Sequence, residues 1–354
     1  MPKQHLIDLN DFSKQEWENL VSLAIKICDN PKNYSDVCKG KILATLFYEP
    51  STRTQMSFQT AMLRLGGNII GFDNPQNSSV AKGENLVDTI KVISGYSDII
   101  AMRHPIAGAG LAAAQYADCP IINAGDGGHL HPTQTLTDLV TMKYEIGHFD
   151  NLTVGLCGDL KNGRTVHSLI KVLTNYNNMK FVLISTAELT IPKYFKDLII
   201  SSGNTFEEIP SLSEAISQLD VLYMTRIQKE RFKNLQEYEK QKNVYILNSK
   251  KLISAKKDLI ILHPLPRVDE ISLDVDDDSR AKYFKQARCG VYARMALILT
   301  LLQQNENEAI LKGENIDKKC LNHDCITNKE LYLKKSFIKE TDGFRCEYCD
   351  MQMK

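Results

Sequence analysis

The chain has 354 residues, 43 % of them hydrophobic, which is enough for two domains and a small third unit. Its 43 Lys and Arg residues balance 43 Asp and Glu residues, whereas nucleic-acid-binding and membrane-surface proteins usually carry a basic excess. No apolar run approaches the roughly 20 residues of a membrane span, and the N-terminus lacks the pattern of a signal peptide. We therefore expect a cytoplasmic protein with reduced thiols and neither nucleic acid nor membrane as partner.

The predicted elements begin with a helix over residues 14–28, where apolar side chains recur at helical spacing. Beyond it, apolar strand-like segments alternate with helix-length segments such as 133–146 and 164–176. Strands are expected at 41–48, 68–72, 98–102, 120–123, 152–157, 180–185, 220–225 and 258–262. Strands that are apolar on both faces and alternate with helices are typical of parallel sheets covered by helices.

There are too many strands for one small sheet. The fold class we predict is α/β, with two doubly wound parallel-sheet domains and a small C-terminal β module. The helix at 133–146 would bridge the two domains, and a late helix would pack back onto the first domain. The predicted boundaries are 1–132 (completed by the helix 285–305), 133–284, a linker at 306–317 and a metal-binding unit at 318–354.

The run "FYEPSTRTQM" stands between a predicted strand and a predicted helix. Ser51, Thr52, Arg53 and Thr54 could simply cap the helix, because Ser and Thr oxygens accept hydrogen bonds from first-turn N–H groups. A helix N-terminus is also an anion site, so the same run could form a phosphate cradle. The rest of the chain has to decide between these interpretations.

Polar side chains follow several other predicted strands, at the edge where ligands bind in open α/β sheets. Arg103, His131, Gln134, Arg164 and Arg226 lie there, with few carboxylates among them. Each alone would be an ordinary structural or surface residue, but together they indicate a site for strongly anionic substrates. Dinucleotide, P-loop, G-x-S-x-G and H-E-x-x-H motifs are absent, so we expect catalysis by positioning and charge stabilisation.

Four of the nine cysteines crowd into the C-terminal segment. "CLNHDC" and "CEYC" place Cys320, Cys325, Cys346 and Cys349 in two close pairs, and in a reducing compartment such pairs indicate a structural zinc site. Four free thiols are the alternative. His323 could compete as a ligand, although four thiolates already complete a tetrahedron.

Six segments together resemble the catalytic chain of the aspartate carbamoyltransferase family: "FYEPSTRT", "MRHP", "GDGGHLHPTQTLTDL", "GRTVHSL", "YMTRIQKERF" and "LHPLPRVDEI". They cover roughly residues 1–305 in the family's order. The ornithine carbamoyltransferases share "STRT" but carry "HCLP" where this chain has "HPLP", and they lack residues like its "RIQKER". Ornithine or another amine acceptor, and a non-catalytic binding or scaffold protein, are the alternatives.

The resemblance implies a transcarbamylase-like fold, a homotrimer as the minimum catalytic unit, and transfer of the carbamoyl group of carbamoyl phosphate to L-aspartate in pyrimidine biosynthesis. The residues implied to bind carbamoyl phosphate are Ser51, Thr52, Arg53, Thr54, Arg103, His131, Gln134, Leu265 and Pro266. Arg53, Thr54, Arg103 and His131 are implied to be catalytic, the last three by polarising the carbamoyl oxygen. Gln134 and the carbonyls of Leu265 and Pro266 are implied to hold the carbamoyl NH₂.

The residues implied to bind aspartate are Lys82, Arg164, Arg226 and Gln228. Ser78 and Lys82 would come from the neighbouring subunit, while Glu49 and Arg231 would orient the arginine clamp. The tail resembles the zinc domain of the family's regulatory chain, which implies one structural Zn²⁺ held by the four cysteines and no metal in the chemistry. The nucleotide-binding domain of that chain is absent, and a nucleic-acid-binding ribbon ranks second for the tail. We expect the tail to dock on its own catalytic domain or on a neighbour's.

Overall fold

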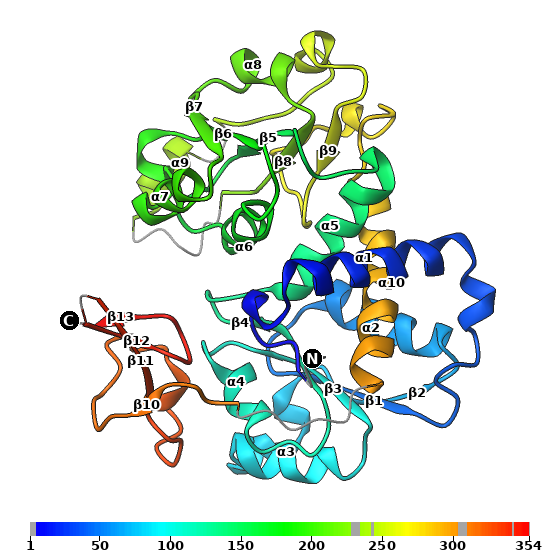
Figure 1. Ribbon diagram of the computed structural model, residues 1–354, viewed down its shortest axis with the longest axis vertical. Coiled ribbons are helices and arrows are strands. Elements are labelled where there is room, and N and C mark those ends of the chain that lie inside the picture. Colours follow the sequence, from blue (N-terminus) through cyan, green and yellow to red (C-terminus); the bar gives the residue numbers. More distant parts are fainter. Residues whose placement is uncertain (1–4, 228–233, 242–243, 304–309, 342, 354) are drawn as a thin grey trace. The chain divides into compact units, whose positions relative to one another are not determined.

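The computed structural model describes residues 5–227, 234–241, 244–303, 310–341 and 343–353. The chain forms two compact units, Met1–Thr133 with Val291–Lys354, and Gln134–Gly290. Each unit contains one parallel sheet, which confirms the predicted α/β class (Figure 1). Among the described residues, none of the helices combines the length and the apolar character that a membrane crossing requires. The domain boundaries given above stay a prediction.

The first unit is built on a four-stranded parallel sheet in the order β2-β1-β3-β4. Its strands are β1 Ile42–Phe47, β2 Asn68–Phe72, β3 Ile99–His104 and β4 Ile121–Asp126. Its helices are α1 Lys14–Asp29, α2 Thr52–Arg64, α3 Leu86–Ser94, α4 Ala109–Ala114 and the part of α10 (Tyr283–Leu302) that follows Gly290. The strands β1, β3 and β4 are almost wholly buried, as expected for a sheet with helices on both faces.

The start of α1 shows how local sequence determines an element. Ser13 accepts a hydrogen bond from the N–H of Glu16, and the Glu16 carboxylate accepts one from the N–H of Ser13. This capping box satisfies donors that a helix start otherwise leaves unpaired. The predicted apolar stripe of α1, from Trp17 to Ile27, is buried.

The second unit is built on a five-stranded parallel sheet in the order β7-β6-β5-β8-β9. Its strands are β5 Thr153–Cys157, β6 Lys180–Ile184, β7 Thr205–Glu208, β8 Val221–Met224 and β9 Ile260–Leu262. Its helices are α5 Pro132–Ile146, α6 Arg164–Leu173, α7 Lys193–Ser201, α8 Leu212–Ala215, α9 Leu235–Gln241 and the start of α10. The edge strand β7 was not predicted, because its residues are mostly exposed and form no apolar run.

Short 3₁₀ turns punctuate both units. They lie at Leu9–Asp11, Pro31–Tyr34, Pro75–Asn77, Ser79–Lys82, Ala187–Leu189, Ile216–Gln218, Lys251–Ser254, Leu273–Val275 and Ile326–Asn328. Two of them fall in the polar segment 73–85, which none of the predicted strands or helices covers, so this segment is folded.

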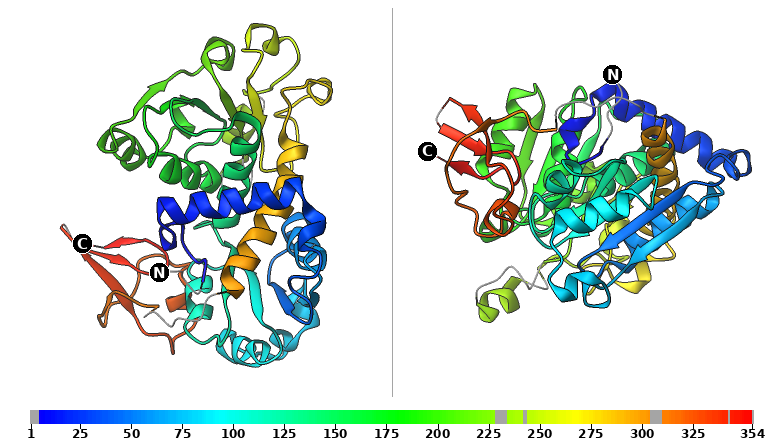
Figure 2. Two further views of the ribbon diagram at one scale, coloured as in Figure 1. Left: turned by 45° about the vertical axis from the view of Figure 1, so that its right-hand side comes forward. Right: turned by 90° about the horizontal axis from the view of Figure 1, so that it is seen from below.

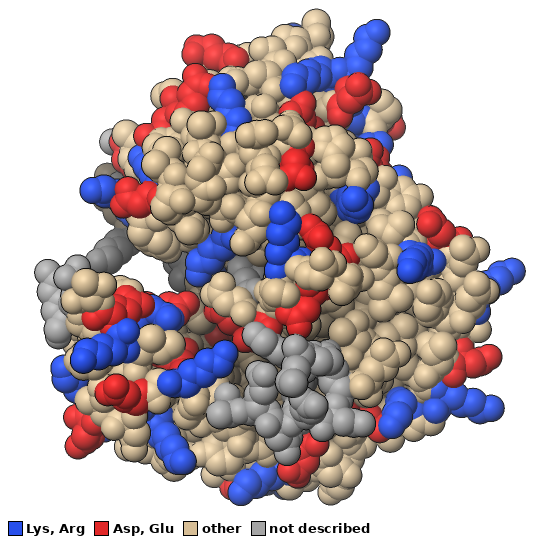
Figure 3. Space-filling view, viewed as in Figure 1, with Lys and Arg blue, Asp and Glu red and all other residues tan. Residues whose placement is uncertain are grey.

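The C-terminal module is an antiparallel sheet in the order β10-β11-β12-β13 (Figure 2). Its strands are β10 Glu314–Asn315, β11 Ser336–Glu340, β12 Gly343–Cys346 and β13 Gln352–Met353. Strand β10 lies inside the segment expected to be a linker and pairs with β11. Positive and negative side chains are interspersed on the face of this module seen in Figure 3, so that face carries no basic patch of the kind that nucleic acids attract.

Candidate functional site

The helix α2 begins directly after the strand β1 and the "EPS" turn. Ser51 is its N-cap residue, but the Ser51 side chain makes no capping hydrogen bond. A simple cap therefore does not explain this residue. Thr52 and Arg53 are exposed, and Ser51 and Thr54 are half-buried, so the run lies at the surface with the donor capacity of a helix start.

Strand pairing places Arg103 beside this run. In the parallel register Arg103 of β3 pairs with Phe47 of β1, and the N–H of Tyr48 donates to the carbonyl of Arg103 at 2.9 Å. Nη2 of Arg103 lies 2.6 Å from Oε1 of Glu49, in a largely buried ion pair. Glu49, which the resemblance implies to orient the arginine clamp, pairs with Arg103. Nε of Arg103 is buried and has no hydrogen-bond partner among the described residues.

Gly125 brings Arg103 and His131 to one place. A Cβ atom on Gly125 would lie 2.7 Å from Nη1 of Arg103 and 3.6 Å from Cδ2 of His131. The φ angle of Gly125 is +125°, a conformation that side chains strongly disfavour. His131 itself is buried, directly precedes α5, and has Nδ1 3.4 Å from the hydroxyl of Thr133. The side chains of Arg103 and His131 therefore both approach Gly125, where only a residue without a side chain leaves them room.

Ser78 and Lys82 lie on the folded segment 73–85. Ser78 caps the second 3₁₀ turn, where its hydroxyl accepts from the N–H of Val80 at 3.3 Å, and the same hydroxyl donates to the carbonyl of Pro75 at 2.7 Å. Lys82 ends the same turn and is exposed. An exposed lysine on an ordered turn is available to a second molecule.

In the second unit, Gln134 belongs to a buried hydrogen-bond network that the sequence did not reveal. Nε2 of Gln134 donates to Oδ1 of Asp138 at 2.8 Å, and Nε2 of Gln286 donates to the same oxygen at 2.6 Å. Tyr223 donates to Oδ2 of Asp138 at 3.0 Å. An ionised carboxylate only accepts hydrogen bonds, so the NH₂ of the Gln134 amide points to Asp138. Its Oε1 is therefore the acceptor that the amide can offer to another group. The spacing of four residues within "QTLTD" was the available signal.

The same network reaches the "HPLP" segment. Oε1 of Gln286 accepts from the N–H of His263 at 2.9 Å, and Nδ1 of His263 accepts from the N–H of Leu265 at 2.8 Å. Nε2 of His263 lies 2.8 Å from Oε1 of buried Glu270. Burial alone would raise the pKa of Glu270, but the hydrogen bond to His263 lowers this pKa. Leu265 has a φ of +54° and precedes a cis peptide bond to Pro266.

The two arginines expected to bind aspartate follow neighbouring strands. Arg164 is the first residue of α6, after β5, and Arg226 follows β8, which pairs with β5. Both side chains are half-buried. The two strand ends touch, because a Cβ on Gly158 would lie 2.3 Å from the carbonyl oxygen of Thr225. Gln228 and Arg231, also expected at this edge, lie outside the described residues.

The four C-terminal cysteines form a cluster that fits zinc. Their sulfurs lie within 4.8 Å of one another, with 3.5 Å between Cys320 and Cys349 and 3.8 Å between Cys325 and Cys346. A tetrahedral Zn²⁺ with Zn–S bonds of about 2.3 Å requires sulfur separations of about 3.8 Å. The Cys320 thiol lowers the pKa of Cys325 and raises the pKa values of Cys346 and Cys349, since close sulfurs cannot all ionise without a cation.

Three family models match the chain. One described as "Aspartate/ornithine carbamoyltransferase, carbamoyl-P binding domain" matches residues 4–144, and one described as "Aspartate/ornithine carbamoyltransferase, Asp/Orn binding domain" matches residues 150–301. The third, "Aspartate carbamoyltransferase regulatory chain, metal binding domain", matches residues 314–354. The tail thus holds a structural zinc site, as predicted.

Similar proteins agree with these matches. The aspartate carbamoyltransferase catalytic subunit of Clostridium perfringens is 58 % identical over 303 residues, covering 85 % of this chain and 99 % of that protein. The corresponding protein of Lachnoclostridium phytofermentans is 57 % identical over 300 residues, covering 84 % and 98 %.

Solved structures give the same result. The catalytic subunit of M. jannaschii aspartate transcarbamoylase has a TM-score of 0.81 and 48 % identity, covering 86 % of this chain and 100 % of that one. Trypanosoma cruzi aspartate transcarbamoylase, in complex with N-(phosphonacetyl)-L-aspartic acid, has a TM-score of 0.78 and 37 % identity, covering 84 % and 95 %.

Replacing one zinc ligand should remove the metal and destabilise the module. Structural zinc contributes roughly 10–16 kcal/mol in small zinc modules, so Cys349→Ser should bind much less than one Zn²⁺ per chain and unfold at lower temperature. Metal analysis of the purified chain and thermal unfolding followed by near-UV circular dichroism measure both effects. Cys28→Ser, on α1, is the control and should keep its zinc. Full zinc content and unchanged unfolding in Cys349→Ser would contradict this assignment.

Proposed function

The chain belongs to the aspartate/ornithine carbamoyltransferase family, and we propose that its first parallel-sheet unit binds carbamoyl phosphate and its second binds L-aspartate. It is an aspartate carbamoyltransferase, which transfers the carbamoyl group to the amine of L-aspartate and releases phosphate. The observation that carries this activity is 58 % identity over 99 % of a catalytic subunit of that name. The test is incubation of the purified chain with carbamoyl phosphate and aspartate, ornithine or no acceptor, scoring phosphate and ureido product. Product with ornithine alone would overturn it.

The phosphate group is proposed to bind at the N-terminus of α2. Ser51, Thr52 and Thr54 supply hydroxyls, Arg53 supplies a cation, and the first-turn N–H groups supply further donors. Such helix starts attract anions because their N–H groups are unpaired and the helix dipole is positive there. The missing side-chain cap at Ser51 supports this role, since its hydroxyl is not used by the helix.

The carbamoyl oxygen is proposed to be polarised by Arg103, His131 and Thr54. As the aspartate amine attacks the carbamoyl carbon, negative charge develops on this oxygen, and preorganised donors stabilise it. The ion pair with Glu49 fixes Arg103 in advance, and its buried Nε still has donor capacity. Removing one donor in comparable sites costs about 2.7–4 kcal/mol.

The carbamoyl NH₂ is proposed to be held by acceptors only. These are Oε1 of Gln134 and the carbonyls of Leu265 and Pro266. The hydrogen bond to Asp138 turns the Gln134 amide so that its oxygen is the acceptor, and the bond to His263 restrains Leu265. Acceptors at this point distinguish the NH₂ from an oxygen of the same size.

The two carboxylates of L-aspartate are proposed to bind Arg164 and Arg226, with help from Gln228. The planar guanidinium fork suits a carboxylate because it can donate two parallel hydrogen bonds. Arg231 is proposed to support this clamp. Pairing of β5 with β8 puts both arginines at one edge of the sheet.

Ser78 and Lys82 are proposed to complete the site of a neighbouring subunit in a homotrimer. The exposure of Lys82 on an ordered turn supports this role.

No metal is proposed in the chemistry, and the zinc ion is structural. The cytoplasm is proposed as the location, because none of the nine cysteines forms a disulfide and five of them lie outside the zinc cluster.

Arg226→Ala should reduce kcat/KM for aspartate by about 100-fold or more, because truncating one partner of a desolvated charge pair costs about 2–5 kcal/mol. Binding of carbamoyl phosphate should change far less. Steady-state kinetics with each substrate varied measure the two effects. The exposed Lys257→Ala, in the same unit, is the control. Equal damage to both substrates would refute the assigned role.

Mixing two inactive variants should restore activity if Lys82 acts in a neighbouring site. Lys82→Ala and His131→Ala chains should each be nearly inactive, and hybrid trimers should recover activity because some sites then contain both intact residues. Dissociation, mixing and reassembly, with hybrids separated by charge tags, allow the measurement. Absence of recovery in verified hybrids would mean that each site is built within one chain.

Gly125→Ala should lower kcat by about tenfold or more, because the new Cβ displaces Arg103 and charge-stabilising donors are sensitive to position. The control is Gly40→Ala, whose φ is +80° but whose Cβ would meet nothing within 4 Å. It also places a side chain at a positive φ, but without the displacement. Equal kcat in the two variants would show that Arg103 and His131 do not depend on this contact.

A further inference from the structure

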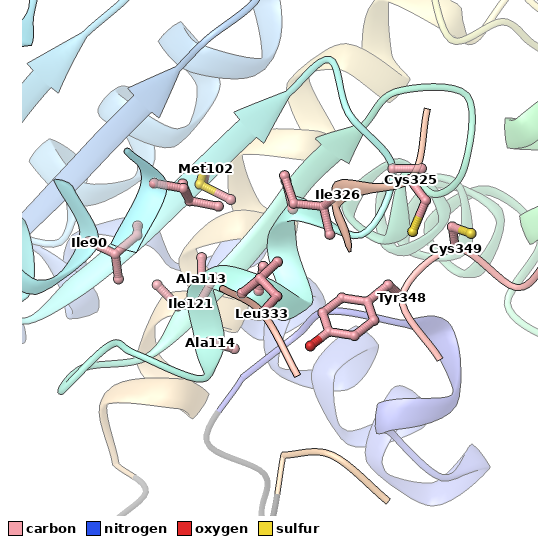
Figure 4. Packing of buried hydrophobic residues seen from close by; sticks show 14 of the residues in the cluster. Ile90, Met102, Ala113, Ala114, Ile121, Cys325, Ile326, Leu333, Tyr348 and Cys349 are labelled. Atoms are coloured by element: carbon pink, nitrogen blue, oxygen red, sulfur yellow. The ribbon is translucent and has the colours of Figure 1, made fainter. Parts of the chain in front are cut away.

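The C-terminal zinc module shares a hydrophobic core with the first unit. Ile326, Leu333 and Tyr348 of the module belong to the same buried cluster as Met102 of β3 and Ala113 of α4 (Figure 4). All four zinc ligands are also members of this cluster. The module is therefore packed on its own chain.

Backbone contacts fix the module next to the loop between β3 and α4. The N–H of Ala107 donates to the carbonyl of Asp324 at 3.1 Å, and the N–H of Ile326 donates to the carbonyl of Ala107 at 2.9 Å. A Cβ on Gly108 would lie 2.6 Å from Cβ of Tyr348, so the surfaces fit closely. Tyr348 also pairs with Gln115 of the first unit, at 3.0 Å.

One side chain of the module reaches the loop that carries His131. Oδ2 of Asp350, the residue after the zinc ligand Cys349, lies 3.0 Å from Nε2 of His129. Nδ1 of His129 lies 3.1 Å from Oδ2 of Asp126. The imidazole therefore bridges a carboxylate of the module and a carboxylate at the end of β4.

This bridge requires a doubly protonated ring. Carboxylates only accept hydrogen bonds, so both nitrogens of His129 must donate, and the ring is an imidazolium. Burial disfavours the charge, yet Asp126 and Asp350 together raise the pKa of His129 to about 10. Nη1 of Arg345 forms an ion pair with the other carboxylate oxygen of Asp350.

Asp126 also accepts hydrogen bonds from other residues in and around this loop. Its Oδ1 accepts from the N–H of Leu130 at 3.0 Å and from Nδ2 of Asn123 at 3.2 Å, and its Oδ2 accepts from the N–H of Gly108 at 2.7 Å. Leu130 directly precedes His131, and Asn123 also accepts from the N–H of Gly125 at 2.9 Å. Both ends of the 125–131 turn depend on this one carboxylate.

We propose that Asp350 of the zinc module is a positioning residue for carbamoyl transfer, which through His129 and Asp126 holds the 125–131 turn so that His131 lies beside Arg103. The inference rests on the role proposed for His131. Residues 314–354 match a domain of the regulatory chain, whereas in this protein His129 and Asp350 belong to one chain.

Asp350→Asn tests the contact in the full chain. Asparagine keeps the size of the side chain and tolerates the φ of +60° found at this residue, but it lacks the charge. We expect one Zn²⁺ per chain, an unchanged quaternary structure, and a kcat about tenfold lower, as expected when a catalytic group is misplaced. Because substrate binding groups are untouched, KM values for both substrates should change by less than about twofold.

Two variants of the module are matched controls. Glu340→Gln removes the other ion-pair partner of Arg345, at 2.7 Å from its Nε, without touching His129. Asp317→Asn removes an exposed charge that pairs with Lys335. Both should keep the wild-type kcat. His129→Gln should lower kcat as Asp350→Asn does, and the double variant should be no worse than either single one.

The spectrum of His129 gives a readout that is independent of activity. In ¹⁵N-histidine-labelled protein at pH 8, the imidazolium signal that disappears in His129→Gln should be present in the wild type and lost in Asp350→Asn. A zinc-loaded Asp350→Asn chain with wild-type kcat would overturn the proposal. If that variant loses zinc, wild-type kcat in zinc-loaded His129→Gln would overturn it equally. A wild-type chain without carbamoyl transfer would instead refute the proposed function, while the signal still reports the contact.

Discussion

The carboxyl ends of parallel strands lie at one edge of a sheet, and the arginines of the proposed site depend on that constraint. In the first unit it puts the run after β1 beside Arg103 at the end of β3, through the register of Phe47 with Arg103. In the second unit it puts Arg164 and Arg226 on the neighbouring strands β5 and β8. Side chains distant in the sequence become neighbours without any dedicated scaffold, because the hydrogen bonds of the sheet already fix the strand ends.

The position of a strand end does not by itself fix the rotamer of a long polar side chain. Buried or half-buried acids remove this freedom: Glu49 holds Arg103, Asp138 holds Gln134, and Glu270 holds His263. Each acid costs free energy of desolvation, which is offset because its oxygens are hydrogen-bonded. Donors and acceptors that are fixed before substrate binds do not have to reorganise as charge develops in the transition state.

The sequence predicted the sheet strands and the residues at their ends well, because both depend on local patterns. The segment 68–72 is β2 to the residue, and the predicted helix at 14–28 is α1 with one residue added. The predicted helix at 285–305 corresponds to α10, which begins two residues earlier, at Tyr283. Strand β7 was not predicted, because an exposed edge strand has no apolar pattern in its sequence.

What the sequence could not give was the partner of each side chain. Asp126, His129 and Asp138 look like ordinary polar residues until the fold shows what they hold. The contact between His129 and Asp350 joins residues 221 positions apart, and no spacing rule reaches that far. Pairings between distant segments are properties of the tertiary structure rather than of local propensity or periodicity.

The placement of the zinc module follows from the size of the module and from its covalent attachment. A unit of about 40 residues buries too little surface to be stable alone, so it needs a metal and benefits from a neighbouring core. Here the zinc ligands Cys320, Cys325, Cys346 and Cys349 are themselves part of a cluster with the alanines of α4. Covalent linkage makes docking intramolecular, with an effective concentration on the order of millimolar for a short linker. Metal binding, which stabilises the module, therefore also stabilises the surface against which the loop of His131 is held, independently of protein concentration.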